Sequence, residues 1–297
     1  MSERAPYIGR FAPSPTGPLH FGSLLAAVAS YLEARARNGH WLLRVEDIDP
    51  PREQAGATEL ILTALELYGF EWDGAIIYQS NSRGAHDDAV QTLLKEDHAY
   101  RCDCSRRDLA TAPRGPLGII YPGTCRNLSG TGDAAIRVRT TDELLAFEDR
   151  LQGAQSQRLE TESGDFVVLR RDSLIAYQLA VVVDDHLQGI TEIVRGIDLL
   201  DSTPRQIWLQ QLLGFTLPAY AHIPVALNLR DQKLSKSTGA GAIPLDRRNV
   251  TLVAALEALE QRPPAELCDA SLDDIWEWAH ANWSMDTLQG RKQIAST

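Results

Sequence analysis

The stretch Arg10–Ser23 combines residue types that handle phosphate groups. Its sequence, RFAPSPTGPLHFGS, follows an apolar run typical of a short buried strand, and its three prolines predict a turn before an alanine-rich helix at Leu24–Ala36. A helix that begins near Gly22 directs unpaired backbone N–H groups and its positive dipole end toward this turn, where His20 can also donate a hydrogen bond to an anion. The pattern favours a triphosphate site. The alternative is a proline-rich turn with a surface histidine.

A second group of chemically active residues consists of Cys102, Cys104 and Cys125, a Cys-x-Cys pair followed by a third cysteine. Zinc prefers four ligands, usually sulfur or imidazole nitrogen. The residues alone leave the fourth ligand open among His98, Asp103, Tyr121 and Cys268. Because phenolate is a rare ligand, His98 ranks above Tyr121 on this basis. The alternative to a zinc site is three buried free cysteines that pack as small apolar residues.

The net charge of −11 argues against binding to nucleic acid through bulk electrostatic attraction. Any contact with RNA must therefore be local, and residues 101–139 carry seven arginines against three aspartates, a local charge of +4. Arginine makes forked contacts with phosphate, so this segment is a candidate RNA-facing patch. The alternative is an ordinary solvated arginine face.

The composition also bounds the class of protein. Hydrophobic residues make up 44% of the chain, which is ordinary for a globular protein, and four cysteines in 297 residues do not make a disulfide scaffold. The sequence has no apolar run of about eighteen residues and no leader that resembles a signal peptide. We therefore expect a cytoplasmic protein that does not enter a membrane.

Two motifs far apart in the chain resemble the paired signatures of class I aminoacyl-tRNA synthetases. Leu19–Gly22 occupies the place of the HIGH motif, and Lys233–Ser237, with the sequence KLSKS, occupies that of KMSKS. Further segments resemble the glutamyl-tRNA synthetase subgroup: Arg10–Gly17, Arg44–Asp49, Val194–Gly196 and Thr203–Gln206. The matches occur in order and span residues 10–237, which is most of the chain.

This resemblance implies a site that activates glutamate with ATP. His20, Gly22 and Lys236 would bind ATP, and His20, Lys233 and Lys236 would act in catalysis, with Mg²⁺ arriving on the ATP phosphates. The glutamate-binding residues implied in the same way are Arg10, Phe11, Ala12, Pro13, Ser14, Glu46, Tyr177 and Arg195.

The implied glutamate-binding residues have suitable chemistry. The Glu46 carboxylate suits the α-amino group, and the guanidinium forks of Arg10 and Arg195 suit the side-chain carboxylate. Each residue also has a structural alternative: Glu46 paired with Arg44, Arg10 paired with Asp47, and Tyr177 in the core.

The glutamyl-queuosine subgroup implies one structural Zn²⁺ per chain, held by a Cys-x-Cys, Tyr, Cys arrangement. This sequence matches that arrangement at Cys102, Cys104, Tyr121 and Cys125. The resemblance therefore reverses the order of Tyr121 and His98 as candidate ligands.

The expected fold class is α/β, with the Rossmann-like parallel-sheet catalytic domain of class I synthetases split by a small zinc-binding insertion. Short apolar strands alternate with amphipathic helices through the first hundred residues, and a proline- and glycine-containing stretch then interrupts them. We expect the first half of the catalytic domain at residues 1–100 and the inserted subdomain at 101–165. The second half, with the KLSKS loop, follows at 166–240, where Phe166–Leu169 resumes the alternation, and a short helical region closes the chain at 241–297.

The last residues decide between subgroups. From residue 251 onward three basic residues oppose eight acidic ones, and the tail is too short for the anticodon-binding domain of full-length glutamyl-tRNA synthetases. The chain in this respect resembles the glutamyl-queuosine tRNA(Asp) synthetases. That resemblance implies activation of L-glutamate with ATP in the absence of tRNA, then transfer of glutamate to the queuosine wobble base of tRNA(Asp), by a monomer. The alternatives are a glutamyl-tRNA synthetase that charges an acceptor end and a catalytically silent tRNA-binding paralogue.

Overall fold

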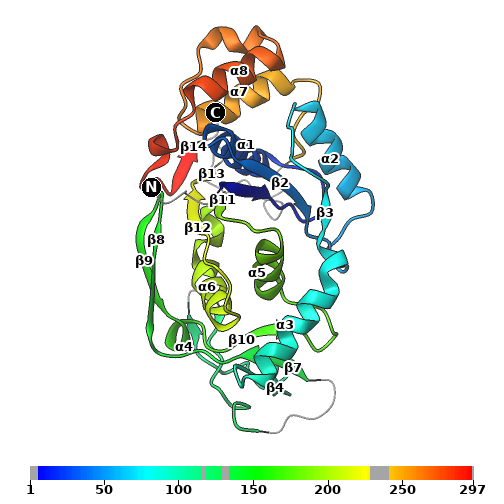
Figure 1. Ribbon diagram of the computed structural model, residues 1–297, viewed down its shortest axis with the longest axis vertical. Helices are drawn as coiled ribbons and strands as arrows, with labels where there is room; N and C mark the ends of the chain where they lie inside the picture. The colour runs from blue at the N-terminus through cyan, green and yellow to red at the C-terminus, as the bar shows by residue number, and fades with distance from the viewer. Residues whose placement is uncertain (1–5, 116–117, 129–133, 228–240, 296–297) are drawn as a thin grey trace.

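A parallel β-sheet lies in the upper half of the molecule as drawn in Figure 1, and the described part of it comprises β1 (Ile8–Phe11), β2 (His40–Val45), β3 (Ile77–Tyr78), β11 (Glu192–Gly196) and β12 (Ala219–Ile223). The structure is a computed structural model that describes residues 6–115, 118–128, 134–227 and 241–295. β1 pairs with β2, β2 with β3, and β11 with β12, all in parallel. The N–H of Thr191 donates to the Ile8 carbonyl at 2.9 Å and joins the two halves.

The order of the strands across the sheet is β3-β2-β1-β11-β12, so the direction of chain progression reverses between β1 and β11. In open α/β sheets, ligands bind beyond the carboxyl ends of the strands at such a reversal. Arg10 lies near the end of β1 and Arg195 near the end of β11, which puts both beside this point. The expected Rossmann-like parallel sheet is thus confirmed.

Helices cover both faces of the sheet, and the helices of the described chain are α1 (Phe21–Ala36), α2 (Ala57–Leu67), α3 (Arg83–Lys95), α4 (Leu159–Glu162), α5 (Tyr177–Leu187), α6 (Thr203–Leu212), α7 (Arg248–Ala258) and α8 (Leu272–Asn282). Figure 1 shows α1 above the sheet, and α5 and α6 below it. Helix α1 contacts β1, β2 and β11 on one side and α7 and α8 on the other. Because it is enclosed from both sides, its sequence is alanine-rich and apolar almost all round.

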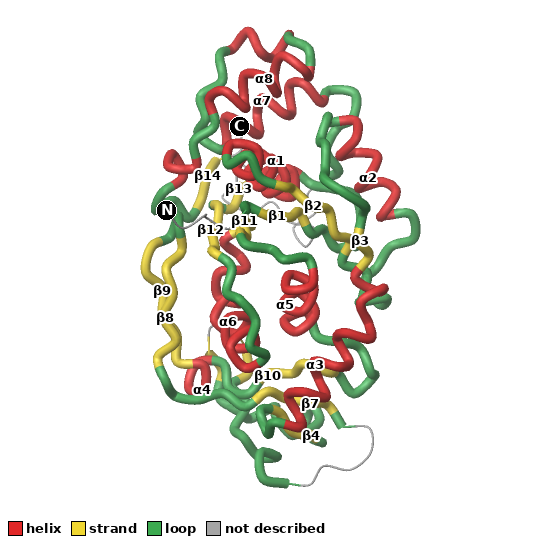
Figure 2. The backbone as a smooth tube through the Cα atoms, viewed as in Figure 1, coloured by secondary structure: helices red, strands yellow, loops and turns green. Residues whose placement is uncertain are grey.

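A second, antiparallel sheet forms at the lower end of the molecule, seen in Figure 2, from β4 (Ala99–Cys102), β7 (Ala135–Val138) and β10 (Phe166–Leu169). We expected Phe166–Leu169 to resume the alternation of the parallel sheet. The strand is present, but it pairs antiparallel with β7, which also pairs antiparallel with β4. The apolar sequence FVVL fits either kind of sheet, so the local pattern does not specify its partner. A short ladder, β5 (Arg114–Gly115) with β6 (Gly118–Ile119), lies in the same segment.

A hairpin of β8 (Leu144–Asp149) and β9 (Gly153–Arg158) connects this lower part with the parallel sheet. Figure 1 shows it as a long ribbon along one side of the molecule. Its turn reaches β12, where Asp149 pairs with Tyr220 and the Arg150 N–H donates to the Tyr220 carbonyl at 2.9 Å. The inserted segment therefore contacts the sheet at the hairpin turn as well as at its two points of attachment.

The C-terminal helices α7 and α8 cover the outer side of α1, and both lie in the region 241–297 that we expected to be helical. Ser271 forms a capping box with Asp274 at the start of α8. The Trp276 ring packs edge-on against Tyr31 and Phe70, with centroid distances of 5.1 Å in both cases. The pairing of β13 (Val225–Leu227) with β14 (Gln293–Ala295) holds the end of the chain beside the sheet. Within the described ranges, no helix is long and apolar enough to cross a bilayer.

Candidate active site and metal centre

The proline-rich loop between β1 and α1 is fixed to its neighbours by backbone hydrogen bonds. The Glu46 N–H donates to the Pro13 carbonyl at 3.0 Å, and the Gln54 N–H donates to the Pro15 carbonyl at 2.9 Å. Gly17 has a φ of +133°, a conformation that a residue with a Cβ adopts only with strain. The loop therefore has a defined shape beside the carboxyl end of β2.

His20 is the N-cap residue of α1. Its Nδ1 accepts a hydrogen bond from the Ser23 N–H at 3.2 Å, so the neutral ring carries its proton on Nε2, which lies 3.1 Å from the Ser23 hydroxyl oxygen. This donor lies at the N-terminus of a sixteen-residue helix, whose dipole also favours an anion. The role of His20 and Gly22 in binding phosphate stays a prediction.

The two lysines of the KLSKS motif, Lys233 and Lys236, lie outside the described residues. Beyond that segment, the Ile243 N–H donates to the Leu19 carbonyl at 3.0 Å, directly before His20. The chain that follows the motif is thus in contact with the loop between β1 and α1.

A buried ion-pair cluster occupies the reversal point of the sheet. Arg10 makes a forked pair with Asp185, with Nε at 3.0 Å and Nη2 at 3.2 Å from its two carboxylate oxygens. Arg44 donates to the same carboxylate at 2.8 Å. Burial alone would raise the pKa of Asp185, but the Arg10 and Arg44 guanidinium groups hold it below its usual range. Arg10 is therefore paired with Asp185 and not with Asp47, the partner that we considered from the sequence.

Glu46 follows β2 and is 7% exposed. Its carboxylate accepts a hydrogen bond from Arg44 Nη2 at 3.3 Å, the pairing expected as the structural alternative. Burial raises the pKa of Glu46 even though the Arg44 and Arg10 charges oppose that shift. A further cation at this carboxylate would stabilise its charged form.

Arg195 is the cation of this region that has no acidic partner. It is 5% exposed, and none of the ion pairs within the described chain includes it. Its Nε donates to His222 Nε2 at 3.0 Å and its Nη2 donates to Thr203 Oγ1 at 2.8 Å. The third nitrogen, Nη1, is buried and has no hydrogen-bond partner in the described part of the structure. A buried donor of this kind fits an anionic ligand.

Two of the remaining predicted glutamate-binding residues, Ser14 and Tyr177, share a pocket with Glu46, whereas Arg10 and Arg195 do not line that pocket. The volume of this pocket is about 280 Å³. Burial raises the pKa of the Tyr177 hydroxyl, with the Glu46 charge adding to the effect, while Arg195 and Arg10 oppose it. The charges of Glu46, Arg195, Arg10 and Asp185 thus all act on the Tyr177 hydroxyl.

The other three predicted residues belong to the chain segment that leads away from β1. Phe11 is buried and stacks on Trp41, with ring centroids 6.2 Å apart, so its side chain belongs to the core. Ala12 and Pro13 connect it to the loop.

Several residues of the site were not found by sequence reasoning. They are Arg44, Asp149, Asp185, Thr203 and His222, which hold the predicted arginines in place. Arg44 was considered only as a partner of Glu46. The sequence signal was weak in each case, because a polar residue inside an apolar run, such as His222 in AYAHI, does not show which charge it contacts.

The three cysteines Cys102, Cys104 and Cys125 meet in the lower part of the molecule, with their sulfur atoms all within 4.8 Å of one another. The Tyr121 Oη lies 3.3 Å from the Cys102 sulfur and 3.5 Å from the Cys104 sulfur. On a tetrahedral zinc ion with bonds of about 2.3 Å, ligand sulfurs lie roughly 3.8 Å apart. The four side chains thus fit one zinc ion, and His98, whose Nε2 lies 3.5 Å from Glu96 Oε2, is not part of the cluster.

The surroundings of the three cysteines are also suited to binding a divalent metal ion. Burial raises the pKa of the Cys104 thiol to about 11, and a bound divalent ion would offset this effect because it stabilises the thiolate. Arg137 donates from Nε to the Cys102 sulfur at 3.3 Å and lies 4.0 Å from the centroid of the Tyr121 ring. It would balance part of the negative charge of three thiolates around a divalent ion.

The sequence model of one protein family, the catalytic domain of class I tRNA synthetases (E and Q), matches residues 8–246 of this chain. A protein of Pseudomonas fluorescens named glutamyl-Q tRNA(Asp) synthetase is 53% identical over 95% of this chain and 93% of its own length. A protein of the same name from Dechloromonas aromatica is 51% identical over 98% of both chains. The chain belongs to the glutamyl-Q tRNA(Asp) synthetase family. This result confirms the resemblance drawn from the motifs.

Solved structures support the fold of this family member. A glutamate-tRNA synthetase from Elizabethkingia anophelis superposes with a TM-score of 0.82 at 24% identity, and the match covers 98% of this chain and 68% of that chain. A glutamate tRNA ligase from Elizabethkingia meningosepticum, solved with its amino acid, superposes with a TM-score of 0.81 at 24% identity. The match covers 98% of this chain and 67% of that chain. At this identity the similarity establishes the fold only.

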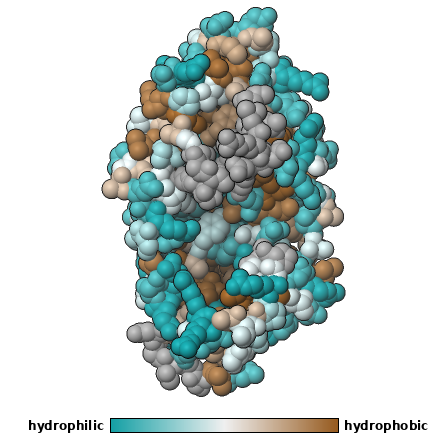
Figure 3. Space-filling view, turned by 180° about the vertical axis from the view of Figure 1, so that it is seen from behind, coloured by the Kyte–Doolittle hydropathy of each residue, from teal (hydrophilic) through white to brown (hydrophobic). Residues whose placement is uncertain are grey.

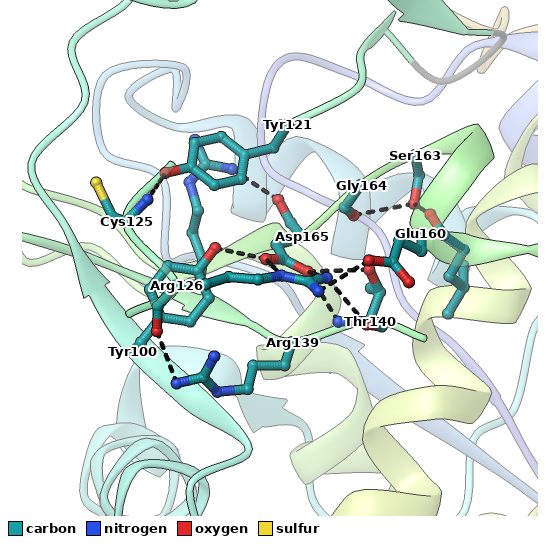
Figure 4. Close-up of polar contacts among 12 residues, drawn as sticks. Tyr100, Tyr121, Cys125, Arg126, Arg139, Thr140, Glu160, Ser163, Gly164 and Asp165 are labelled. Carbon is teal, nitrogen blue, oxygen red and sulfur yellow. Dashed lines mark hydrogen bonds and ion pairs between the residues drawn. The ribbon is translucent and has the colours of Figure 1, made fainter. Parts of the chain in front are cut away.

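The seven arginines between residues 101 and 139 divide into two groups. Figure 4 shows Arg126 lying between Asp165 and Glu160; its Nη1 is 2.8 Å from Glu160, and two of its nitrogens are 2.6 Å from the Asp165 carboxylate. Arg137 contacts the cysteine cluster, and Arg139 pairs with Asp97, so these three have structural partners. The exposed arginines of the segment are Arg101, Arg106, Arg107 and Arg114. Figure 3, which views the molecule from behind, shows hydrophilic residues beside apolar ones at the lower end, where the inserted segment lies.

Proposed function

We propose that this protein activates glutamate with ATP to form glutamyl-adenylate without tRNA, and then transfers the glutamate to the queuosine base of tRNA(Asp). The names of relatives that are 50% to 54% identical support the tRNA specificity. The family model supports the activation chemistry, since class I tRNA synthetases for E and Q form the matching domain.

The observation that carries glutamate recognition is the unpartnered buried Nη1 of Arg195. In this proposal it donates to the side-chain carboxylate of glutamate, together with Arg10, whose pairing with Asp185 fixes its orientation. Glu46 receives the α-amino group, because burial has raised its pKa and an ammonium group stabilises the charged carboxylate. Tyr177 and Ser14 contact the ligand from the wall of the pocket.

The reaction is an attack of the α-carboxylate oxygen of glutamate on the α-phosphorus of ATP. The new O–P bond forms as the bond to pyrophosphate breaks, and negative charge develops on the phosphoryl oxygens. His20 donates from the N-terminus of α1 to these oxygens, and the backbone at Gly22 allows the phosphates close to the helix. Lys236 and Lys233 stabilise the leaving pyrophosphate, and Mg²⁺, held mainly by ATP oxygens, supplies additional positive charge.

The metal centre has a structural role in this proposal. Cys102, Cys104, Cys125 and Tyr121 hold one zinc ion, which ties together an insertion that has only a small apolar cluster of its own. The exposed arginines of the insertion contact the tRNA backbone, because local positive charge is needed on a protein of net charge −11.

The activation step is tested by amino-acid-dependent exchange of pyrophosphate into ATP in the absence of tRNA. Glutamate should support exchange. Glutamine, which has the same shape without the carboxylate charge, should support at most about 1% of that rate, since a buried guanidinium without an anionic partner is strongly disfavoured. Exchange with glutamine at a comparable rate would contradict the assignment of Arg195, and no exchange with either amino acid would contradict the proposed activity.

A further inference from the structure

His222 lies between the candidate glutamate-binding residue Arg195 and a carboxylate from the insertion hairpin. Its Nε2 accepts a hydrogen bond from Arg195 Nε at 3.0 Å, and its Nδ1 is 2.6 Å from Asp149 Oδ2. The side chains of His222 and Asp149 are both completely buried. The three side chains therefore form a continuous chain from the turn of the β8–β9 hairpin to the guanidinium group.

The hydrogen bonds fix the tautomer of His222. Arg195 Nε can only donate, so the Nε2 of His222 must be unprotonated. The remaining ring proton is then on Nδ1, where it donates to Asp149. Burial lowers the pKa of His222 to about 4, with the nearby Arg195 charge acting in the same direction, so the ring is neutral near pH 7.

The orientation of Asp149 is fixed independently of His222. Its Oδ1 accepts hydrogen bonds from the backbone N–H groups of Leu151 at 3.0 Å, Gln152 at 2.9 Å and His222 at 3.2 Å. Three donors at one oxygen leave only Oδ2 to face the imidazole. The turn of the hairpin thus determines which atom the histidine ring meets.

We infer that Asp149 and His222 are positioning residues for the amino-acid site: Asp149 holds His222 in the Nδ1-protonated tautomer, and His222 holds Arg195 with Nη1 directed to the substrate carboxylate. Thr203 completes the arrangement, because it accepts from Arg195 Nη2 at 2.8 Å. Nε and Nη2 are then engaged by the protein, and Nη1 remains for the ligand. The inference rests on the proposed function, since it assigns the support of Arg195 in glutamate binding.

The origin of Asp149 gives the insertion a second role. The β8–β9 hairpin leaves the lower part of the molecule and returns to β12, and it places Asp149 beside His222 in that strand. The insertion therefore contributes to recognition of the amino acid in addition to any contact with tRNA.

The substitution Asp149→Asn tests the tautomer directly. The three backbone donors will hold the amide oxygen in the place of Oδ1, so the amide NH₂ group will face Nδ1 of His222 as a donor. The ring must then carry its proton on Nε2, where it opposes the Nε–H of Arg195. We expect the KM for glutamate in pyrophosphate exchange to rise about 30-fold, as for loss of a hydrogen bond to a charged group, while the KM for ATP changes by less than about twofold.

A pair of substitutions at His222 separates positioning from structure. Gln offers an oxygen near the place of Nε2 and can still accept from Arg195, whereas Leu offers no acceptor. His222→Leu should raise the KM for glutamate at least as much as Asp149→Asn, and His222→Gln should recover about tenfold of that loss. The Gln and Leu variants both remove the hydrogen bond to Asp149, so a purely structural role predicts similar defects in the two.

Arg150→Met is the matched control. Arg150 lies next to Asp149 in the same turn. Its side chain forms an ion pair with Glu33 of α1 at 2.6 Å and thereby holds the turn to that helix. Within the described part of the structure, the Arg150 side chain has no contact with His222. This variant should lower thermal stability and leave the KM for glutamate within about twofold of wild type.

The outcomes distinguish the inference from the proposed function. The inference is overturned if Asp149→Asn has the same KM for glutamate as wild type, or if His222→Gln and His222→Leu have equal defects. In either case, glutamate-dependent pyrophosphate exchange by the wild-type protein would still support the proposed function. Should Asp149→Asn fail to fold, the two His222 variants decide alone. Wild-type protein without glutamate-dependent exchange would overturn both.

Discussion

Arg195 uses the forked shape of its guanidinium group as well as its charge. Two of its nitrogens contact His222 and Thr203, and the third has no partner within the described residues. We expect Arg195→Lys to lower kcat/KM for glutamate about 100-fold, because an ammonium group cannot make both fixed contacts and still present a donor to the ligand. Pyrophosphate exchange at varied glutamate concentration measures this effect.

A control for Arg195→Lys is Arg35→Lys, which alters an arginine that pairs with Asp73 away from the ion-pair cluster. Its kcat/KM should remain within about twofold of wild type. Equal effects of the two substitutions would show that Arg195 contributes only charge.

The buried His222 makes stability depend on pH. Its pKa in the folded protein is about 4, below the ordinary value of 6.5, because burial disfavours the charged ring. The unfolded chain binds a proton as pH falls below 6.5 and the folded protein does not, so stability from the neutral ring is present above 6.5 and is lost toward pH 4. The pKa of this ring is also affected by the charges of Asp149, Arg195 and Asp198, and the Thr203 hydroxyl lies beside its Nε2.

We expect the difference in unfolding free energy between wild type and His222→Gln to shrink by about 2 kcal/mol between pH 7 and pH 5. Urea unfolding at both pH values measures it, and subtraction of the variant removes the contribution of other titrating groups. A difference that does not change with pH would mean that His222 titrates normally in the folded protein.

Motifs identified the arginines and the glutamate of the site, but not the residues that hold them. Arg10, Glu46 and Arg195 were predicted because they lie in segments of characteristic sequence. Asp185 was not, because it lies in the last turns of α5, 175 residues after its partner Arg10, and nothing in a single sequence reports contacts of that separation. Ion-pair partners are set by the packing of elements, which local patterns do not encode.

At the scale of single elements, the cysteine cluster decides whether the insertion depends on a metal. Cys104→Ala should lower the zinc content from about one ion per chain to near zero, because removal of one of four ligands opens the site. Elemental analysis of protein purified without chelator measures the loss, and thermal melting should show a lower transition for the insertion.

Cys268→Ala is the control for the metal centre, because Cys268 is also a free cysteine but is not part of the cluster. Its zinc content should equal that of wild type. Zinc-free wild-type protein would contradict the metal assignment and favour three packed thiols.

The aromatic contact between α8 and α1 should hold the C-terminal helices in place. Trp276 is 7% exposed, packs against Tyr31 and Phe70, and donates from its indole N–H to the Tyr68 carbonyl at 2.9 Å. We expect Trp276→Ala to lower the free energy of unfolding by about 3–5 kcal/mol. Urea denaturation measures the change, with Leu60→Ala, at 54% exposure, as a control that should cost less than about 0.5 kcal/mol. A smaller loss at Trp276 than at Leu60 would show that the C-terminal helices do not contribute to the core.

The type of most elements could be predicted from sequence, and their partners could not. The strand at Phe166–Leu169 is present, but it belongs to the antiparallel sheet of the insertion. The β8–β9 hairpin was not predicted at all, because its second strand, GAQSQR, has little apolar periodicity. Its stability comes from pairing along its whole length and from contacts of its turn with β12.

For the whole molecule, the positions of the arginines can be compared with the two proposed binding functions, that for glutamate and that for tRNA. The net charge is −11, and the buried arginines of the candidate amino-acid site are balanced by Asp185 and Glu46 except for Arg195. Exposed arginines occur in several parts of the described chain, and four of them, Arg101, Arg106, Arg107 and Arg114, lie within fourteen consecutive residues of the insertion. The local density of positive charge in the insertion fits the proposed contact with a nucleic acid backbone, and the unbalanced Arg195 fits an anionic amino acid. The sequence alone predicted the local basic segment but not that Arg126, Arg137 and Arg139 have internal partners.

The most direct test of the proposed function is transfer of labelled glutamate to two tRNA pools, one that carries queuosine and one that lacks it, with ATP and Mg²⁺ supplied. Activation at the Arg195 site followed by transfer to the modified base predicts labelling of the queuosine pool alone. Equal labelling of both pools would contradict this and indicate charging of the acceptor end, and labelling of neither would indicate a tRNA-binding protein without transfer activity.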